Sequence, residues 1–157
     1  ACSESAANTL TFAKMSQGVD IFNKVGWVIN RLEYYIGSVV AAEFNGDADS
    51  LDWALCVSNN MLSLNDLANP AILDFHRLQL LYFGAAASGW YFSQPIVVDY
   101  SSLPGGGLIV PPSPLYLGVK GTGLVAANSV AIRGYFTQIE LKADQYIELV
   151  EARRIIT

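Results

Sequence analysis

The sequence is poor in charged side chains. Only 15% of its 157 residues are charged, whereas 52% are hydrophobic; an average soluble domain has about 25% charged residues. So few charges do not cover the surface of a monomer of this size, which indicates either a large core or a surface that neighbouring molecules cover. No linker and no internal repeat interrupts the chain. We therefore expect a flexible arm over the small, polar residues 1–9 and a single domain over residues 10–157.

Basic residues are the scarcer of the two charge types. The chain has nine Lys and Arg and 14 Asp and Glu, which gives a net charge of −5. Residues 32–75 contain seven acidic residues and no basic residue. A groove for a phosphate backbone requires clustered Lys and Arg, so we expect no direct contact with nucleic acid. The longest nearly apolar run, residues 78–92, is shorter than the ~20 residues of a membrane span, so we expect no span either.

The usual catalytic and metal-binding side chains are also few. The chain has one histidine, His76, and two cysteines, Cys2 and Cys56. Asp74 and His76 share a face if they lie on a strand, but a metal centre takes three or four protein ligands. A disulfide between the cysteines would hold the N-terminal arm in place, although the number two by itself does not indicate one. We expect no enzyme activity and no cofactor.

One acidic cluster follows Asn45. Calcium prefers oxygen-rich loops of this kind, so Asp47, Asp49 and Asp52 are the candidates for a metal site. The EF-hand pattern is absent, and a solvated acidic turn is the interpretation that we favour. Residues 118–123, GVKGTG, lack the order of a phosphate-binding loop and are predicted to be a turn.

Alternating hydrophobic residues and frequent turn residues predict short strands. Residues 71–83 also fit a helix that starts at Pro70, but their alternation and their aromatic residues favour a strand. The pattern predicts an all-β fold, an antiparallel β-sandwich with at most one or two short helices. The predicted strands are residues 9–15, 26–36, 51–58, 71–83 and 128–141, and residues 146–156 are a strand or a short helix. The short linker GAAASG before WYFSQPIVVDYS favours a strand pair between residues 71–83 and 90–101.

The strand over residues 26–36 has the clearest alternation. It places Trp27, Ile29, Arg31, Glu33 and Tyr35 on one face and Val28, Asn30, Leu32, Tyr34 and Ile36 on the other. Arg31 and Glu33, with Arg133 on another strand, are charges within apolar strands. Because a buried ion pair is costly to desolvate, we expect these charges to line a subunit contact.

Residues 101–123 form the most unusual segment. Pro104 and three glycines precede Leu108, and Pro111, Pro112 and Pro114 follow it, so neither a helix nor a central strand is expected to pass through. We interpret the segment as a long shaped loop whose surface fits another protein surface. The alternative is that its apolar residues cap the core of the chain itself. The candidate interface residues are Leu108, Ile109, Val110, Pro112, Leu115 and Tyr116.

The segments LPGGGLIVPPSPLYLGVKGTG and SVAIRGYFTQIEL, together with the succession of short strands, resemble viral and phage structural proteins, in particular single jelly-roll capsid proteins. The resemblance implies a jelly-roll-like sandwich that assembles in the virion with copies of itself and with other virion proteins. Many such coats have a basic N-terminal arm, whereas this chain has only Lys14 in its first 20 residues. A shell, decoration or tail role away from the genome fits this difference.

Two other functions remain open at this point. A carbohydrate- or receptor-binding β-sandwich module, of the phage tail or decoration type, would use Trp27, Trp53, Trp90 and the tyrosines as stacking platforms. An acid-dependent hydrolase would need two carboxylates close together in a cleft.

Overall fold

The computed structural model describes residues 1–15, 25–37, 46, 48–66, 68–79, 94–110, 113–140, 142 and 144. In this part of the chain the regular elements are β-strands, which confirms the predicted all-β class. The strands are β1 (Cys2–Ser3), β2 (Thr11–Lys14), β3 (Val25–Ile36), β4 (Ser50–Cys56), β5 (Ile72–Gln79), β6 (Ile96–Asp99), β7 (Leu108–Val110), β8 (Tyr116–Thr122) and β9 (Ser129–Glu140).

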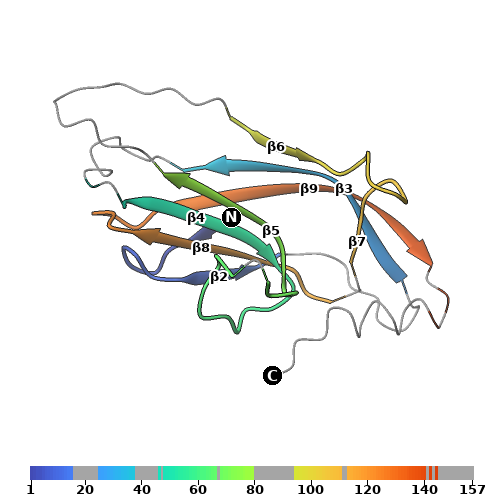
Figure 1. The fold of residues 1–157 in the computed structure, drawn as a ribbon, viewed down its shortest axis with the longest axis horizontal. Helices are drawn as coiled ribbons and strands as arrows, with labels where there is room; N and C mark the ends of the chain where they lie inside the picture. The colour runs from blue at the N-terminus through green and yellow to red at the C-terminus, as the bar shows by residue number, and fades with distance from the viewer. Residues whose placement is uncertain are drawn as a thin grey trace.

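The strands form two antiparallel sheets that pack face to face (Figure 1). Sheet A has the order β1-β9-β3-β6, with β7 also paired to β3, and sheet B has the order β2-β8-β4-β5. The pairs are nested along the chain: β1 with β9, β2 with β8, β3 with β6 and β7, and β4 with β5. This is one long hairpin rolled into a sandwich, the jelly-roll arrangement. The predicted β-sandwich is therefore confirmed.

Strand β3 does not keep a single alternation along its length. A β-bulge between Ile29 and Arg31 leaves Asn30 without a partner residue on β9. An extra residue shifts the alternation by one, so Trp27 and Ile29 enter the core, and Leu32 and the even-numbered residues after it do the same. The prediction that Trp27 shares a face with Arg31 was wrong. The bulge allows the charged residues to face outward while the apolar residues on both sides of it stay inside.

Strands β6 and β7 pair with consecutive parts of the same edge of β3, and residues 100–107 leave the sheet between them. The expected pairing of residues 71–83 with residues 90–101 was wrong, because β5 pairs with β4 in the other sheet. Asn30 holds the loop of residues 100–107 at both ends. Its side-chain N–H donates to the Gly106 carbonyl at 2.7 Å, and its backbone carbonyl accepts from Tyr100 N at 2.8 Å. Gly105 and Gly106 have φ values of 90° and 76°, a backbone conformation that favours glycine.

Strands β7 and β8 both lie within residues 101–123, so the loop is shorter than predicted. The expectation that no central strand passes through this segment was wrong, because β8 pairs with a strand on each of its edges.

The prediction of a turn over residues 118–123 was also wrong for most of its length. Residues 118–122 belong to β8, which pairs with β2 and β4 on its two edges. A Cβ atom at Gly118 would lie 2.8 Å from side-chain atoms of Leu64 and Phe12. Glycine at this position therefore permits close packing against sheet B.

Residues 1–9 differ from the flexible arm that the sequence predicts. Cys2 is buried in β1 against β9, and the buried Glu4 carboxylate accepts hydrogen bonds from Gly121 N at 2.7 Å and Asn128 N at 2.9 Å. Asn8 exchanges hydrogen bonds with the backbone of Leu124. These contacts attach the start of the chain to the turn between β8 and β9.

The main hydrophobic core lies between the sheets, and a smaller second core lies on the outer side of sheet B. There the connection between β4 and β5, residues 57–71, folds back over the sheet, and Met61 and Leu64 cover Ala54 and Cys56. Both cysteines are buried and free, one in each sheet. Among the described residues no helix has the length and apolar character needed to cross a membrane. The C-terminal segment 146–156 and residues 80–83 of the predicted fourth strand lie outside the described residues.

Candidate functional site on the outer face of sheet A

The predicted interface residues of the proline-rich segment are divided between the core and the surface. Val110 and Leu115 are buried in the core of the chain itself, and Leu108 packs against that core. Ile109 pairs with Val28 across the two strands, and since side chains alternate along β7 it faces outward from sheet A. Tyr116 is half-buried at the start of β8, and Pro112 lies outside the described residues.

The calcium candidates do not come together. Asp47 lies outside the described residues, and the buried Asp49 carboxylate accepts from Gly46 N at 2.7 Å. Both carboxylate oxygens of Asp52 accept hydrogen bonds from Arg77, at 2.7 and 2.8 Å. In the described ranges no group of three or more His, Cys, Asp and Glu side chains is arranged to hold a metal ion.

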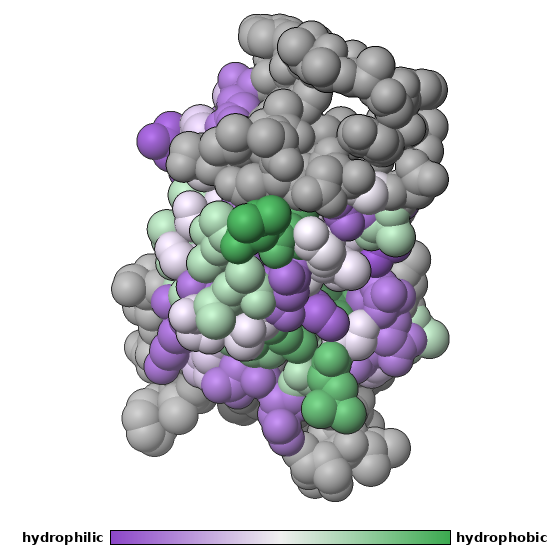
Figure 2. All heavy atoms as spheres, turned by 90° about the vertical axis from the view of Figure 1, so that its left-hand side faces the viewer, coloured by the Kyte–Doolittle hydropathy of each residue, from purple (hydrophilic) through white to green (hydrophobic). Residues whose placement is uncertain are grey.

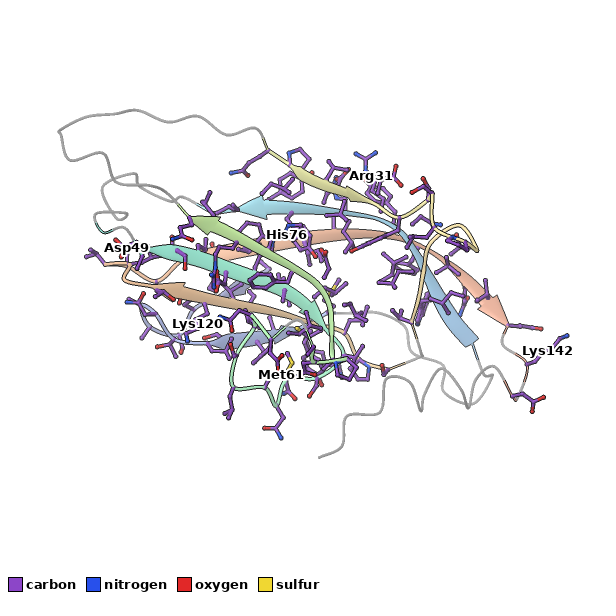
Figure 3. The ribbon with its side chains drawn as sticks, viewed as in Figure 1. Arg31, Asp49, Met61, His76, Lys120 and Lys142 are labelled. Atoms are coloured by element: carbon purple, nitrogen blue, oxygen red, sulfur yellow. The ribbon has the colours of Figure 1, made fainter. Side chains whose placement is uncertain are left out.

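Asp74 and His76 lie on one face of β5, as the sequence predicts, and they contact aromatic side chains of both sheets. Figure 3 labels His76. One Asp74 oxygen accepts from the Tyr34 hydroxyl at 2.6 Å and from His76 Nε2 at 2.8 Å. His76 stacks on Trp53 at 5.5 Å between ring centroids. We call Tyr34, Trp53, Asp74, His76 and Tyr100 the inner cluster. Sequence reasoning missed Tyr34 and Tyr100 because they come from sheet A and its β6 edge.

The electrostatics of the inner cluster follow from its burial. Burial alone would raise the pKa of the Asp74 carboxyl, but hydrogen bonds from His76, Tyr34 and Tyr100 outweigh it and lower that pKa. Burial, together with the Asp74 charge, raises the pKa of the hydroxyls of Tyr34 and Tyr100. The carboxylate therefore stays ionised and the phenols stay neutral at pH 7. This arrangement ties sheet A to sheet B.

A second polar cluster lies on the outer face of sheet A, around Glu33. The buried Glu33 carboxylate is 2.7 Å from Arg31 Nη2 and 3.8 Å from Arg133 Nη1. It also accepts from the hydroxyls of Tyr35 at 3.1 Å and Tyr135 at 3.3 Å. Each guanidinium lies over a tyrosine ring, Arg31 over Tyr135 and Arg133 over Tyr35. We call these five residues the outer cluster.

The outer cluster arises from strand register. Glu33 pairs with Arg133, and Arg31 pairs with Tyr135, across β3 and β9. Loss of solvent and the hydrogen bond to Glu33 raise the pKa of the Tyr35 hydroxyl. Unlike the inner cluster, this one remains open to solvent: Arg133 is 63% exposed at its side chain. Arginine and tyrosine are the residue types that carry binding energy at protein interfaces.

The remaining candidates offer little chemistry. Trp27 and Trp53 are buried and so cannot serve as sugar-stacking platforms, and Trp90 lies outside the described residues. Burial raises the pKa of the Cys56 thiol to about 12, which makes it a poor nucleophile. A cavity of about 50 Å³ lies between the sheets near Trp27 and Phe136, far below the ~300 Å³ at which ligand pockets begin.

Exposed apolar side chains are spread over the molecule. At the end of the sandwich in Figure 2, hydrophobic residues form separate patches among polar ones. Leu62, at the outer side of the 57–71 connection, is 98% exposed, and Leu103 and Val125 lie exposed in other loops. Apolar residues that are scattered singly in this way are common on protein surfaces, so by themselves they do not mark a binding site. A comparison of the chain with protein-family models, with curated proteins and with solved structures found no match.

Proposed function

We propose that this chain is a structural subunit of a protein shell, of the single jelly-roll capsid type, and that it acts in the virion by self-assembly without catalysis. The observation that carries the proposal is the nested pairing of its strands into a rolled hairpin. This arrangement occurs in viral capsid subunits, and also in lectin domains and cupins. The features of the surface distinguish among these.

The chemistry of the chain favours assembly over the other uses of the fold. The single histidine is engaged with Asp74, and the buried thiols are poor nucleophiles. Two of the three tryptophans that a lectin-like module would present are buried. What the described surface does offer is an arginine–tyrosine face and apolar loop residues, the composition of a protein interface.

The partners that we propose are copies of the chain itself, together with other virion proteins. Three of the arginines are engaged in ion pairs with acids of the same chain, Arg31 and Arg133 with Glu33, and Arg77 with Asp52. With a net charge of −5 the chain offers little to a phosphate backbone. A position away from the genome is consistent with this balance.

Light scattering and electron microscopy of the purified chain test the proposal. We expect a molar mass that rises with protein concentration far above the 17.0 kDa of one chain, and rings or closed shells in the images. A monodisperse 17.0 kDa species at every concentration and salt condition, from a protein that is folded by circular dichroism, would contradict it.

A further inference from the structure

The outer face of sheet A has the composition and the solvent exposure of a protein interface. Around the outer cluster, Val97 of β6 and Tyr135 of β9 are both more than 40% exposed, and the half-buried Ile109 continues the face along β7. The face is a broad antiparallel surface with rigid aromatic rings. An aromatic side chain held in one conformation loses little entropy when a partner covers it.

The two arginines of this face differ in the carboxylates that surround them. Arg31 lies 2.7 Å from Glu33 and also pairs across the strands with the exposed Asp99, whereas Arg133 is 3.8 Å from Glu33 and is 63% exposed at its side chain. A guanidinium has several N–H donors in a planar fork, and the distant Glu33 carboxylate leaves donors of Arg133 able to bind a further carboxylate. The chemistry that complements this face is a carboxylate next to an apolar side chain.

The 57–71 connection, on the opposite side of the molecule, has both kinds of side chain. In the 57–71 connection the neighbours Met61 and Leu64 are buried and hold the backbone on sheet B, while Leu62 between them points away from the chain. Asp66 is exposed further along, and its carboxylate accepts one bond, from Ala68 N at 3.2 Å. Because Met61 and Leu64 fix the loop on sheet B, Leu62 is held in an exposed position without help from a partner.

We propose that the 57–71 connection of one copy docks on the outer face of sheet A of a second copy, with Leu62 against Tyr135 and Val97 and the Asp66 carboxylate against Arg133. The inference rests on the proposed self-assembly and names the surfaces that perform it. Figure 3 places Arg31 and Met61 on opposite sides of the sandwich. The contact is therefore head-to-tail, and it makes a closed ring when the rotation between copies closes.

Charge reversal tests the contact. Arg133→Glu and Asp66→Arg each put like charges together, so each should raise the protein concentration at half-assembly by about tenfold or more. The double variant, with both charges exchanged, should return most of the assembly, measured by light scattering. Both residues lie on the surface, so circular dichroism and the melting temperature should stay close to wild type. Lys14→Glu, an exposed reversal on β2, serves as the matched control and should assemble like wild type.

The outcomes separate this inference from the proposed function. If wild type stays monomeric at all concentrations, both fail. If wild type assembles and the single reversals assemble equally well, or the double variant is no better than the singles, the proposed contact is overturned and self-assembly stands. Leu62→Ser gives a test without charge: a loss of assembly at an unchanged melting temperature supports the contact, and unaltered assembly contradicts it.

Discussion

Glu33 and Tyr34 are adjacent residues of β3, and their side chains enter polar clusters on opposite faces of sheet A. Tyr34 points inward and donates to Asp74 of sheet B, in a cluster closed by Trp53 and His76. Glu33 points outward and collects two arginines and two tyrosines at the surface. Both clusters contain a carboxylate that accepts hydrogen bonds from tyrosine hydroxyls.

The difference between the two clusters lies in their solvent exposure. In the inner cluster the cost of burying the Asp74 charge is offset by hydrogen bonds from both sheets, so the cluster contributes to the stability of the sandwich. In the outer cluster the guanidiniums are exposed, and exposed ion pairs add little to stability. We therefore infer that the inner cluster holds the fold together and that the outer cluster is available for a partner.

The largest expected effect is on the inner cluster. Asp74→Ala leaves the fully buried Tyr34 hydroxyl without its acceptor, and we expect the free energy of unfolding to fall by about 3 kcal/mol. Urea unfolding measures it. Lys14→Ala, which removes an exposed charge on β2, is the control and should stay within about 0.5 kcal/mol of wild type. Equal losses of unfolding free energy in the two variants would show that Asp74 has no special role in stability.

The inner cluster also predicts an acid dependence. The pKa of Asp74 is lower in the folded chain than in the unfolded one, so its contribution to stability is present above the unfolded pKa, about 4, and is lost as the pH falls through the folded pKa. We expect the stability difference between wild type and Asp74→Asn to be constant from pH 7 to pH 5 and to shrink below about pH 4. A difference that does not change down to pH 2 would show that the carboxylate charge is irrelevant.

A smaller effect is expected for the outer carboxylate. Glu33→Ala removes the acceptor of two tyrosines and two arginines, but these side chains reach solvent, so we expect a loss of about 1 kcal/mol in monomer stability. The comparison of the two clusters would break down if this loss matched that of Asp74→Ala. Thermal unfolding at high salt, where assembly contacts between charges are screened, provides the measurement.

The smallest effect on stability is expected at Arg133. Arg133→Gln keeps the length of much of the side chain and removes its charge, and we expect a change of less than about 0.5 kcal/mol in unfolding free energy. Assembly should nevertheless weaken, because the guanidinium donors are lost. A variant that is clearly destabilised as a monomer would place Arg133 among the residues that hold the fold.

Much of the fold could be predicted from local patterns. Alternation and turn residues indicate β3, β4, β5 and β9, because each strand has one face toward a core. The phase shift at Asn30 could not be derived from the sequence, since a bulge depends on the pairing with the partner strand. A signal was nevertheless present: Arg31 and Glu33 continue the phase of Trp27 and Ile29, and no single face accommodates both pairs.

The candidate site was harder to predict. Arg31, Glu33 and Arg133 stand out as charges in apolar strands, and they were expected at a subunit contact, which stays a prediction. Their meeting with Tyr35 and Tyr135 depends on the pairing of β3 with β9, residues about 100 positions apart in the chain. The apolar residues of the proline-rich segment were all predicted to form an interface, yet Val110 and Leu115 lie in the core of the chain itself. A core-facing Val110 and a partner-facing valine look the same in sequence, and only the pairing of β7 separates them.

The central claim is that copies of this chain meet through the outer face of sheet A. Cryo-electron microscopy of the assembled wild-type chain tests it most directly, because it shows which surfaces touch. The account predicts that Arg133 and Tyr135 of each copy lie under the 57–71 connection of its neighbour, with Leu62 buried. Assemblies in which the outer face of sheet A is open to solvent would contradict it.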